Sequence, residues 1–275
     1  MNKNEIKITK NNEIEFFQFK RLLKHHNINH AYILKTHNMN FNCCKDFSHI
    51  EEVKENLKIV SKNCGFKYES IIRPDYEHTN NVEIVDRVDN SKEIPELRGE
   101  RFQNTDGLIT NKKDITLMST HADCNLIFLF DNEKNVIANV HAGWRGTFDK
   151  IAKNAVEKMK KEFNSNPENI EAYFCPSIRK CHFEVDEDVR ELCEKAFEYT
   201  GKLDEIISKG EIKEGKQKYL IDTVLINTIL LKESGVLDEN IVDCGICSVC
   251  RSDIIHSRRV EGVKFNLNTA SICLT

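Results

Sequence analysis

The segment Ser119–Thr147, STHADCNLIFLFDNEKNVIANVHAGWRGT, contains the features that decide how this chain folds. Two apolar runs of strand length, Leu126–Phe130 and Val136–Val140, are joined by a polar turn. This pattern predicts an antiparallel hairpin, in which the end of the second run returns beside the start of the first. Cys124 and His141 would then face each other at one end of a sheet.

Polar residues adjoin both runs. His121, Asp123 and Cys124 precede the first run, and the sequence HAGWRG follows the second. A converging thiol and imidazole are typical either of metal ligands or of a nucleophile with its general base. In the second case Asp123 would orient His141. Because the same residues serve both interpretations, the sequence leaves the choice open.

Composition and charge exclude several classes of protein. The chain has 275 residues, of which 40% are hydrophobic and 31% are charged, as in an ordinary globular protein. A net charge of −4, with no block of basic residues, argues against nucleic-acid binding. We find no internal repeat, low-complexity linker or shift in composition. The sequence therefore predicts a single domain over residues 1–275.

The N-terminal residues are polar and charged, and no segment has the length and apolarity of a signal peptide or a membrane span. We therefore expect a cytoplasmic protein without membrane contact. In that reducing compartment, the eleven cysteines would be thiols, metal ligands or catalytic groups and not a disulfide framework.

Helical periodicity and capping residues predict five helices along the chain: 16–26, 48–64, 147–163, 186–199 and 222–235. The third would begin directly after HAGWRG. A helix N-terminus offers backbone amides to an anion, and Arg145 would add a charged fork, so phosphate is a candidate ligand. A surface arginine beside a buried tryptophan explains the same residues equally well. Residues 200–217 are expected to form a loop.

His78 lies in a polar turn between two predicted strands. With Cys124 and His141 it would complete a three-ligand set, which leaves a zinc ion one open position for water or substrate. The alternative is a buried cysteine and a hydrogen-bonded histidine without a metal. Three further histidines are expected in loops or at the surface: His25, His26 and His30.

Cys247 and Cys250 form a CxxC pair, a spacing typical of half a zinc site or of a redox dithiol. A structural zinc needs a second pair of ligands. The spacing of Cys175 and Cys181 does not fit, and neither does that of the adjacent Cys43 and Cys44. We interpret the CxxC cysteines as thiols without a metal, and their role stays open.

These motifs together resemble a known family. HADC with the following LFD, and NVHAGWRGT after it, closely resemble the TADC and HAGWRG signatures of the laccase-domain family. Its members were first called multi-copper polyphenol oxidoreductases and were later recognised as purine nucleoside phosphorylases with adenosine deaminase activity. Similar segments extend along most of the chain: NMNF at 38–41, VKEN at 53–56, YEHTNNV at 76–82, NTDGLIT at 104–110, CPSIRKCHFEV at 175–185, YLIDTVLINTILLKESGV at 219–236, CSVC at 247–250 and HSRR at 256–259.

The resemblance implies an α+β fold, with a mixed β-sandwich flanked by helices. It implies a zinc site, with copper as the alternative ion, at His78, Cys124 and His141. It also implies phosphorolysis of adenosine, inosine and S-methyl-5'-thioadenosine to the free base and a (methylthio)ribose 1-phosphate, and deamination of adenosine. The expected partners are a purine nucleoside and phosphate, and the chain would be a monomer or a homodimer.

The expected chemistry assigns roles to four residues, and family position assigns roles to three more. Cys124, His141, Asp123 and Arg145 are expected to be catalytic. Asn40, Arg258 and Arg259 are expected to bind substrate.

The chain departs from the family pattern at seven positions: Tyr76, His121, Asn125, Cys175, Arg179, His182 and Val260. The three metal ligands are intact, so the departures bear on base preference. Two functions of other classes are weaker alternatives. A copper-dependent polyphenol oxidase normally has His-X-His pairs, which the sequence lacks. A non-catalytic binding protein would not need three metal ligands.

Overall fold

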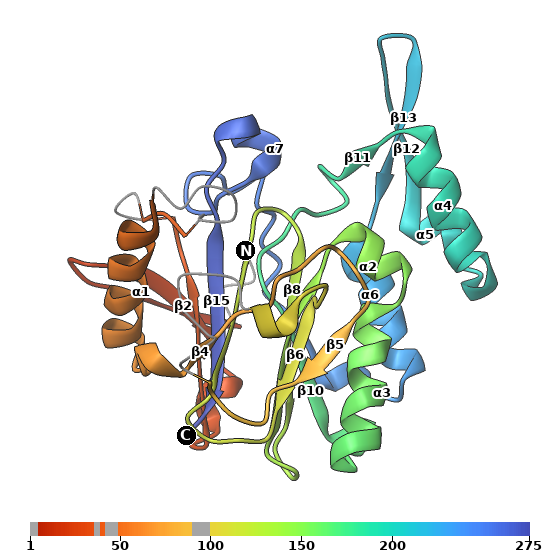
Figure 1. Cartoon of the computed structure of the whole chain (residues 1–275). Coiled ribbons are helices and arrows are strands. Elements are labelled where there is room, and N and C mark those ends of the chain that lie inside the picture. Colours follow the sequence, from red (N-terminus) through yellow and green to blue (C-terminus); the bar gives the residue numbers. More distant parts are fainter. Residues whose placement is uncertain (1–4, 36–38, 42–48, 90–99) are drawn as a thin grey trace.

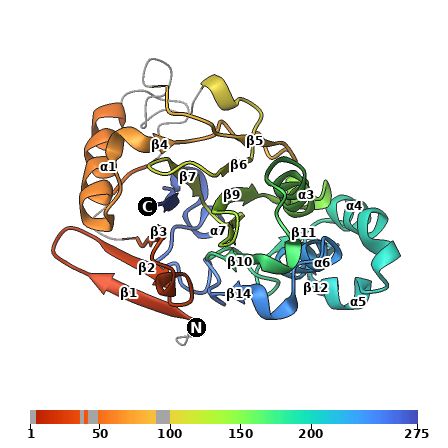
Figure 2. The same ribbon diagram turned by 90° about the horizontal axis from the view of Figure 1, so that it is seen from below.

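The computed structural model describes residues 5–35, 39–41, 49–89 and 100–275. Within these residues, two mixed six-stranded sheets pack face to face, and helices cover the outer faces (Figures 1 and 2). One cluster of buried apolar side chains lies between the two sheets. A second cluster lies between one sheet and its helix, and a third lies between the other sheet and its helices. The predicted α+β sandwich flanked by helices is confirmed.

The first sheet joins the two ends of the described chain. Its strands in spatial order are β1 (Ile6–Lys10), β2 (Glu15–Phe19), β3 (Ile28–Ile33), β15 (Asn268–Leu274), β7 (Thr116–His121) and β4 (Ile71–Ile72). The C-terminal strand β15 pairs antiparallel with both β3 and β7. Helix α1 (Ile50–Cys64) covers the outer face and ends at Gly65, whose φ is 73°. This helix is confirmed, while its predicted N-cap, Ser48, lies outside the described residues.

The second sheet contains the predicted hairpin. Its strands in spatial order are β14 (Ile241–Asp243), β10 (Ile170–Phe174), β8 (Asn125–Asp131), β9 (Val136–Ala142), β6 (Gly107–Thr110) and β5 (Val82–Ile84). Two helices, α3 (Ile151–Phe163) and α6 (Thr223–Glu233), pack on its outer face. No helix in the described part of the chain is both long and apolar enough to span a membrane.

Strand β8 is apolar from Leu126 to Phe130, as expected of a strand whose two faces are both buried. Leu126, Phe128 and Phe130 point between the sheets, and the alternate residues Ile127 and Leu129 point toward the helices. The pairing of β8 with β9 is antiparallel and sets Leu126 opposite His141. The hairpin prediction is confirmed, and Cys124 and His141 lie at the same end of the sheet.

A smaller sheet extends away from the sandwich (Figure 1). It contains β11 (Glu184–Val185), β13 (Lys216–Ile221) and β12 (Ile207–Lys213), with the helices α4 (Glu187–Phe197) and α5 (Leu203–Ile206) beside it. The loop expected over residues 200–217 is therefore wrong. The hairpin turns at Glu214 and Gly215, which both have positive φ, and its mostly exposed strand carries no apolar alternation to reveal it.

Two helix predictions need correction. Residues 16–26 form the end of β2 and a single 3-10 turn at Leu22–Lys24, because Phe16 packs under α1 while Phe17 and Phe19 point between the sheets. The helix expected over 147–163 is interrupted, with α2 at Trp144–Phe148 and α3 beginning at Ile151. Lys150, with a φ of 65°, breaks it.

Candidate metal centre and active site

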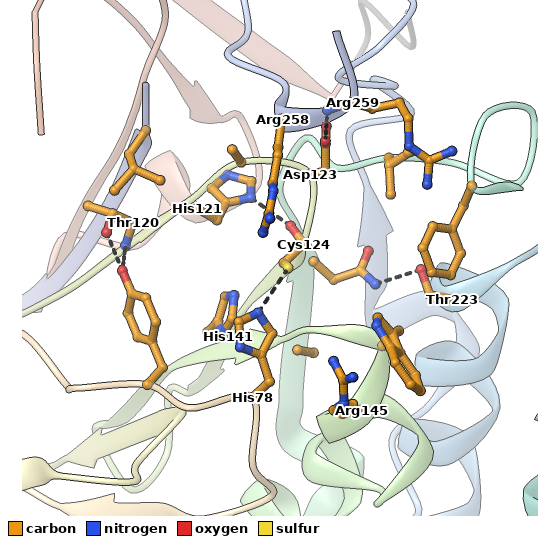
Figure 3. Close-up of a pocket in the computed structure, with 18 of the residues that line it drawn as sticks. His78, Thr120, His121, Asp123, Cys124, His141, Arg145, Thr223, Arg258 and Arg259 are labelled. Carbon is orange, nitrogen blue, oxygen red and sulfur yellow. Dashed lines mark hydrogen bonds between the residues drawn. The ribbon is translucent and has the colours of Figure 1, made fainter. Parts of the chain in front are cut away.

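A cavity of about 540 Å³ opens at the end of the sandwich, where the chain crosses from β7 in one sheet to β8 in the other (Figure 3). Its size lies within the roughly 300–1,000 Å³ typical of small-molecule sites. The predicted site residues that line it are His78, Asp123, Cys124, His141, Arg145, Arg258 and Arg259.

The three predicted metal ligands meet at one wall of this cavity. One ligand atom from each of His78, Cys124 and His141 lies within 4.8 Å of the others. The Cys124 sulfur is 3.9 Å from His78 Nε2, and the two imidazole rings meet edge to face with centroids 5.1 Å apart. Figure 3 shows the three side chains converging from a loop, the β7–β8 crossover and β9.

A buried carboxylate, Asp106, positions both histidines. Asp106 Oδ1 accepts hydrogen bonds from His141 Nδ1 at 2.9 Å and from the His78 backbone amide at 3.1 Å, and its Oδ2 accepts from the Thr79 amide at 2.8 Å. These bonds hold His78 in its left-handed conformation, with a φ of 60°. They also leave His141 Nε2 as the ligand atom, the usual arrangement of a carboxylate, a histidine and a metal. Asp106 is not among the site residues that the sequence predicts.

The charges and hydrogen bonds within the cluster favour the thiolate form of Cys124. Burial by itself raises the pKa of Cys124, but the charge of His141 and hydrogen bonds from His141 and His78 outweigh it and lower the pKa to about 6. Burial lowers the pKa of His141, while the Cys124 thiolate and Asp106 outweigh it and raise the pKa to about 10. One thiolate and two imidazoles form a donor set that suits zinc or copper.

Glycines in HAGWRG allow the chain to pass close to this cluster. A Cβ atom on Gly143 would lie 2.5 Å from His78 Cδ2 and 3.5 Å from the Cys124 sulfur. A Cβ atom on Gly146 would lie 2.4 Å from the Thr79 carbonyl oxygen. Both glycines are needed because no side chain fits between α2 and the His78 turn.

The anion site expected at a long helix N-terminus is corrected by the structure. HAGWRG leads into α2, which has only five residues, and the longer α3 starts after the break at Lys150. The helix-terminus argument for phosphate is therefore lost. Arg145 still lines the cavity, with its guanidinium 4.2 Å from the centre of the Trp144 ring.

Asp123 does not orient His141, which is the task of Asp106. Instead its Oδ1 accepts a hydrogen bond from Ser248 Oγ at 2.6 Å, and its Oδ2 accepts one from the Arg259 amide at 2.8 Å. Its backbone is in the left-handed region, with a φ of 82°. The carboxylate is thus held at the cavity wall by two segments that follow much later in the chain.

The three residues expected to bind substrate are placed differently. Arg258 and Arg259 line the cavity from the short helix α7 (Arg258–Glu261). Arg259 also donates hydrogen bonds to the carbonyl oxygens of His182 and Glu184, each at 3.1 Å. Asn40 is not among the described residues that line the cavity, and its carbonyl oxygen accepts a hydrogen bond from Asn56 at 2.9 Å.

The sequence matches the family described as multi-copper polyphenol oxidoreductase laccase over residues 29–274. The chain belongs to this family. It is 28% identical to the purine nucleoside phosphorylase YlmD of Bacillus subtilis, covering 76% of this chain and 72% of that protein. It is 31% identical to the adenosine deaminase RL5 of an unknown prokaryotic organism, covering 74% and 75%.

Solved structures show the same fold. The crystal structure of the Bacillus licheniformis hypothetical protein YfiH superposes with a TM-score of 0.84 at 21% identity, covering 98% of this chain and 99% of that one. YlmD from Geobacillus stearothermophilus superposes with a TM-score of 0.81 at 18% identity, covering 97% and 98%. At these identities the likeness concerns the fold.

Three departures of this laccase-family chain from the family motifs line the cavity: Tyr76, His121 and Asn125. Tyr76 stacks on His141 with ring centroids 4.6 Å apart. His121 points away from the metal cluster, with Nδ1 2.6 Å from the Cys124 carbonyl oxygen and Nε2 2.9 Å from the Tyr32 hydroxyl. The buried Asn125 accepts a hydrogen bond from Ser177 Oγ at 2.8 Å and so ties β8 to the next loop.

Proposed function

We propose that this chain is a metal-dependent purine nucleoside enzyme. It would phosphorolyse adenosine, inosine and S-methyl-5'-thioadenosine to the base and the sugar 1-phosphate, and it would deaminate adenosine. The relatives named as purine nucleoside phosphorylases and as an adenosine deaminase support this class of substrate. The observation that carries the proposal is the cluster of His78, Cys124 and His141 at the wall of a cavity of about 540 Å³.

His78, Cys124 and His141 would hold the metal, either zinc or copper, in the proposed mechanism. Three protein ligands are the number with which a catalytic zinc ion would keep one position for water or substrate. When bound, the ion supplies Lewis acidity and lowers the pKa of water.

The remaining side chains of the cavity would contact different parts of the substrates. Arg145 and Arg258 line the cavity and bring positive charge to it, which suits a phosphate that attacks the anomeric carbon. Asp123, held by Ser248 and the Arg259 amide, would in its protonated form give a proton to the departing purine and become the carboxylate. We assign Arg259 a structural role in the cavity wall, because its guanidinium already donates hydrogen bonds to the carbonyl oxygens of His182 and Glu184.

Incubation of the purified protein with adenosine tests the proposal. With phosphate present we expect adenine and ribose 1-phosphate, and we expect inosine in its absence. A chelator should stop both reactions, and so should His141→Ala. Turnover of adenosine to inosine by His141→Ala at the wild-type rate would overturn the metal mechanism. Binding of adenosine without any product would instead indicate a binding protein, and oxidation of a polyphenol alone would indicate an oxidase.

A further inference from the structure

Four potential metal ligands meet behind the cavity wall, apart from the cluster of His78, Cys124 and His141. They come from two loops, with Cys181 and His182 between β10 and β11, and Cys247 and Cys250 after β14. One ligand atom from each lies within 4.8 Å of all the others. The CxxC pair therefore has the second pair of ligands that the sequence did not reveal.

The distances within this cluster are those of a tetrahedron. Bond lengths of about 2.3 Å for Zn–S and about 2.0–2.1 Å for Zn–N set edges of roughly 3.8 Å between two sulfurs and roughly 3.6 Å between sulfur and nitrogen. The Cys181 sulfur lies 3.7 Å from that of Cys247 and 3.9 Å from that of Cys250. His182 Nδ1 lies 3.2, 3.7 and 3.5 Å from the sulfurs of Cys181, Cys247 and Cys250.

A disulfide does not explain the cluster. The three cysteines are free thiols, and sulfurs 3.7–3.9 Å apart are far beyond the roughly 2.05 Å of a disulfide bond. A redox dithiol also needs no fourth group, whereas here an imidazole nitrogen is close to all three sulfurs. Three cysteines and one histidine form a closed set that structural zinc sites use, with no vertex left for a substrate.

Other contacts between the two loops keep these four ligands close together. Arg179 forms a two-pronged ion pair with Asp243, with both nitrogen–oxygen distances 2.8 Å, and donates from Nε to the Ile246 carbonyl oxygen at 3.2 Å. The Ser248 amide donates to the Ser177 carbonyl oxygen at 3.0 Å. Arg179 and His182 are both departures from the family pattern, and both belong to this arrangement.

We propose that Cys181, His182, Cys247 and Cys250 bind a second metal ion, Zn²⁺, in a structural site. The ion joins the two loops and fixes the wall behind the cavity. Ser248 lies between the two CxxC cysteines and bonds the Asp123 carboxylate, and Arg259 bonds the His182 carbonyl oxygen. Each of the two loops is therefore hydrogen-bonded to a residue that lines the cavity, and the ion itself contacts no substrate.

Metal content of the full chain, purified with zinc and dialysed, tests the site independently of activity. We expect two equivalents in the wild type, and one in each of His141→Ala and Cys250→Ser. The double variant should hold none. His182→Cys, which keeps four ligands, should retain two, and so should Cys64→Ala, which removes a thiol at the end of α1. One equivalent in the wild type, unchanged in Cys250→Ser, would overturn the proposal.

A second measurement applies if Cys250→Ser does not fold. In the wild-type protein, Cys181 and Cys250 are exposed and would alkylate readily as free thiols. With zinc bound, we expect both to be protected until a chelator is added, as read by peptide mass spectrometry. Equal alkylation rates of Cys250 with and without the chelator would contradict the site.

Discussion

Asp106 connects the two histidines of the metal centre, because one carboxylate accepts hydrogen bonds from the His141 ring and from the amides of the His78 turn. Asp106→Asn should weaken metal binding at this centre about 10- to 100-fold, because outer partners of ligating histidines have effects of that size. Competition with a chromophoric chelator measures the affinity. Asp114→Asn, an exposed aspartate that accepts from Lys67, is the matched control. Equal affinities in both variants would contradict the role of Asp106.

His30 illustrates a pH effect in the core. It was expected at the surface, yet it is 1% exposed, and its Nε2 accepts a hydrogen bond from the Phe19 amide at 2.7 Å. Burial lowers its pKa from 6.5 to about 3. The folded state requires the neutral ring, so its contribution to stability is complete above pH 6.5 and is lost as the pH falls toward 3.

We therefore expect the unfolding free energy of the wild type to fall with pH below 6.5 more steeply than that of His30→Gln. The difference in slope should approach about 1.4 kcal/mol per pH unit. Urea unfolding at several pH values between 7.5 and 4.5 gives both slopes. His26→Gln, at an exposed position, should keep the wild-type slope. Parallel pH dependence in His30→Gln and the wild type would show that His30 does not carry this effect.

At the scale of elements, the backbone at Gly143, just before α2, determines how closely His78 can approach Cys124 and His141. Gly143→Ala would place a Cβ atom 2.5 Å from His78 Cδ2, so that the His78 turn must move away from Cys124 and His141. We expect the folded variant to lose the metal of this centre, as measured by metal content. Gly210→Ala on β12, where the Cβ would meet the Lys218 carbonyl oxygen at 3.2 Å, should keep it. Full metal content in both variants would argue against the close approach at Gly143.

Helices with clear capping residues at their ends were predicted well. Helix α1 ends at Gly65, and α6 begins after Asp222, whose side chain accepts a hydrogen bond from the Leu225 amide at 2.9 Å. Residues 16–26 were predicted wrongly because their aromatic residues face two different layers. The run is therefore apolar without alternation, and periodicity alone does not distinguish a buried strand from a helix in so short a run.

At the scale of the whole molecule, one buried side chain connects the two sheets. Asn139 on β9 donates from Nδ2 to the carbonyl oxygens of Leu117 on β7, at 3.1 Å, and of Ala270 on β15, at 3.0 Å. Asn139→Ala removes both bonds and leaves a void in the sandwich. We expect it to lower the unfolding free energy by about 2–4 kcal/mol.

Urea unfolding followed by circular dichroism measures this loss. Asn132→Ala, at an exposed position in the β8–β9 turn, is the control and should change stability by less than about 0.5 kcal/mol. A comparably small effect of Asn139→Ala would show that apolar packing alone holds the sheets together.

The sequence by itself determined the β8–β9 hairpin, the sandwich class and the three ligands of the first metal centre. The hairpin follows from two apolar runs joined by a polar turn, whereas the sandwich and the ligand set follow from motifs along most of the chain that resemble a known family. Only the tertiary structure decided that Asp106 supports both histidines, that Asp123 is held by Ser248 and Arg259, and that Cys181 and His182 meet the CxxC pair. The residues in each of these contacts are distant in sequence, and it is the packing of the two sheets, with their end loops, that brings them together.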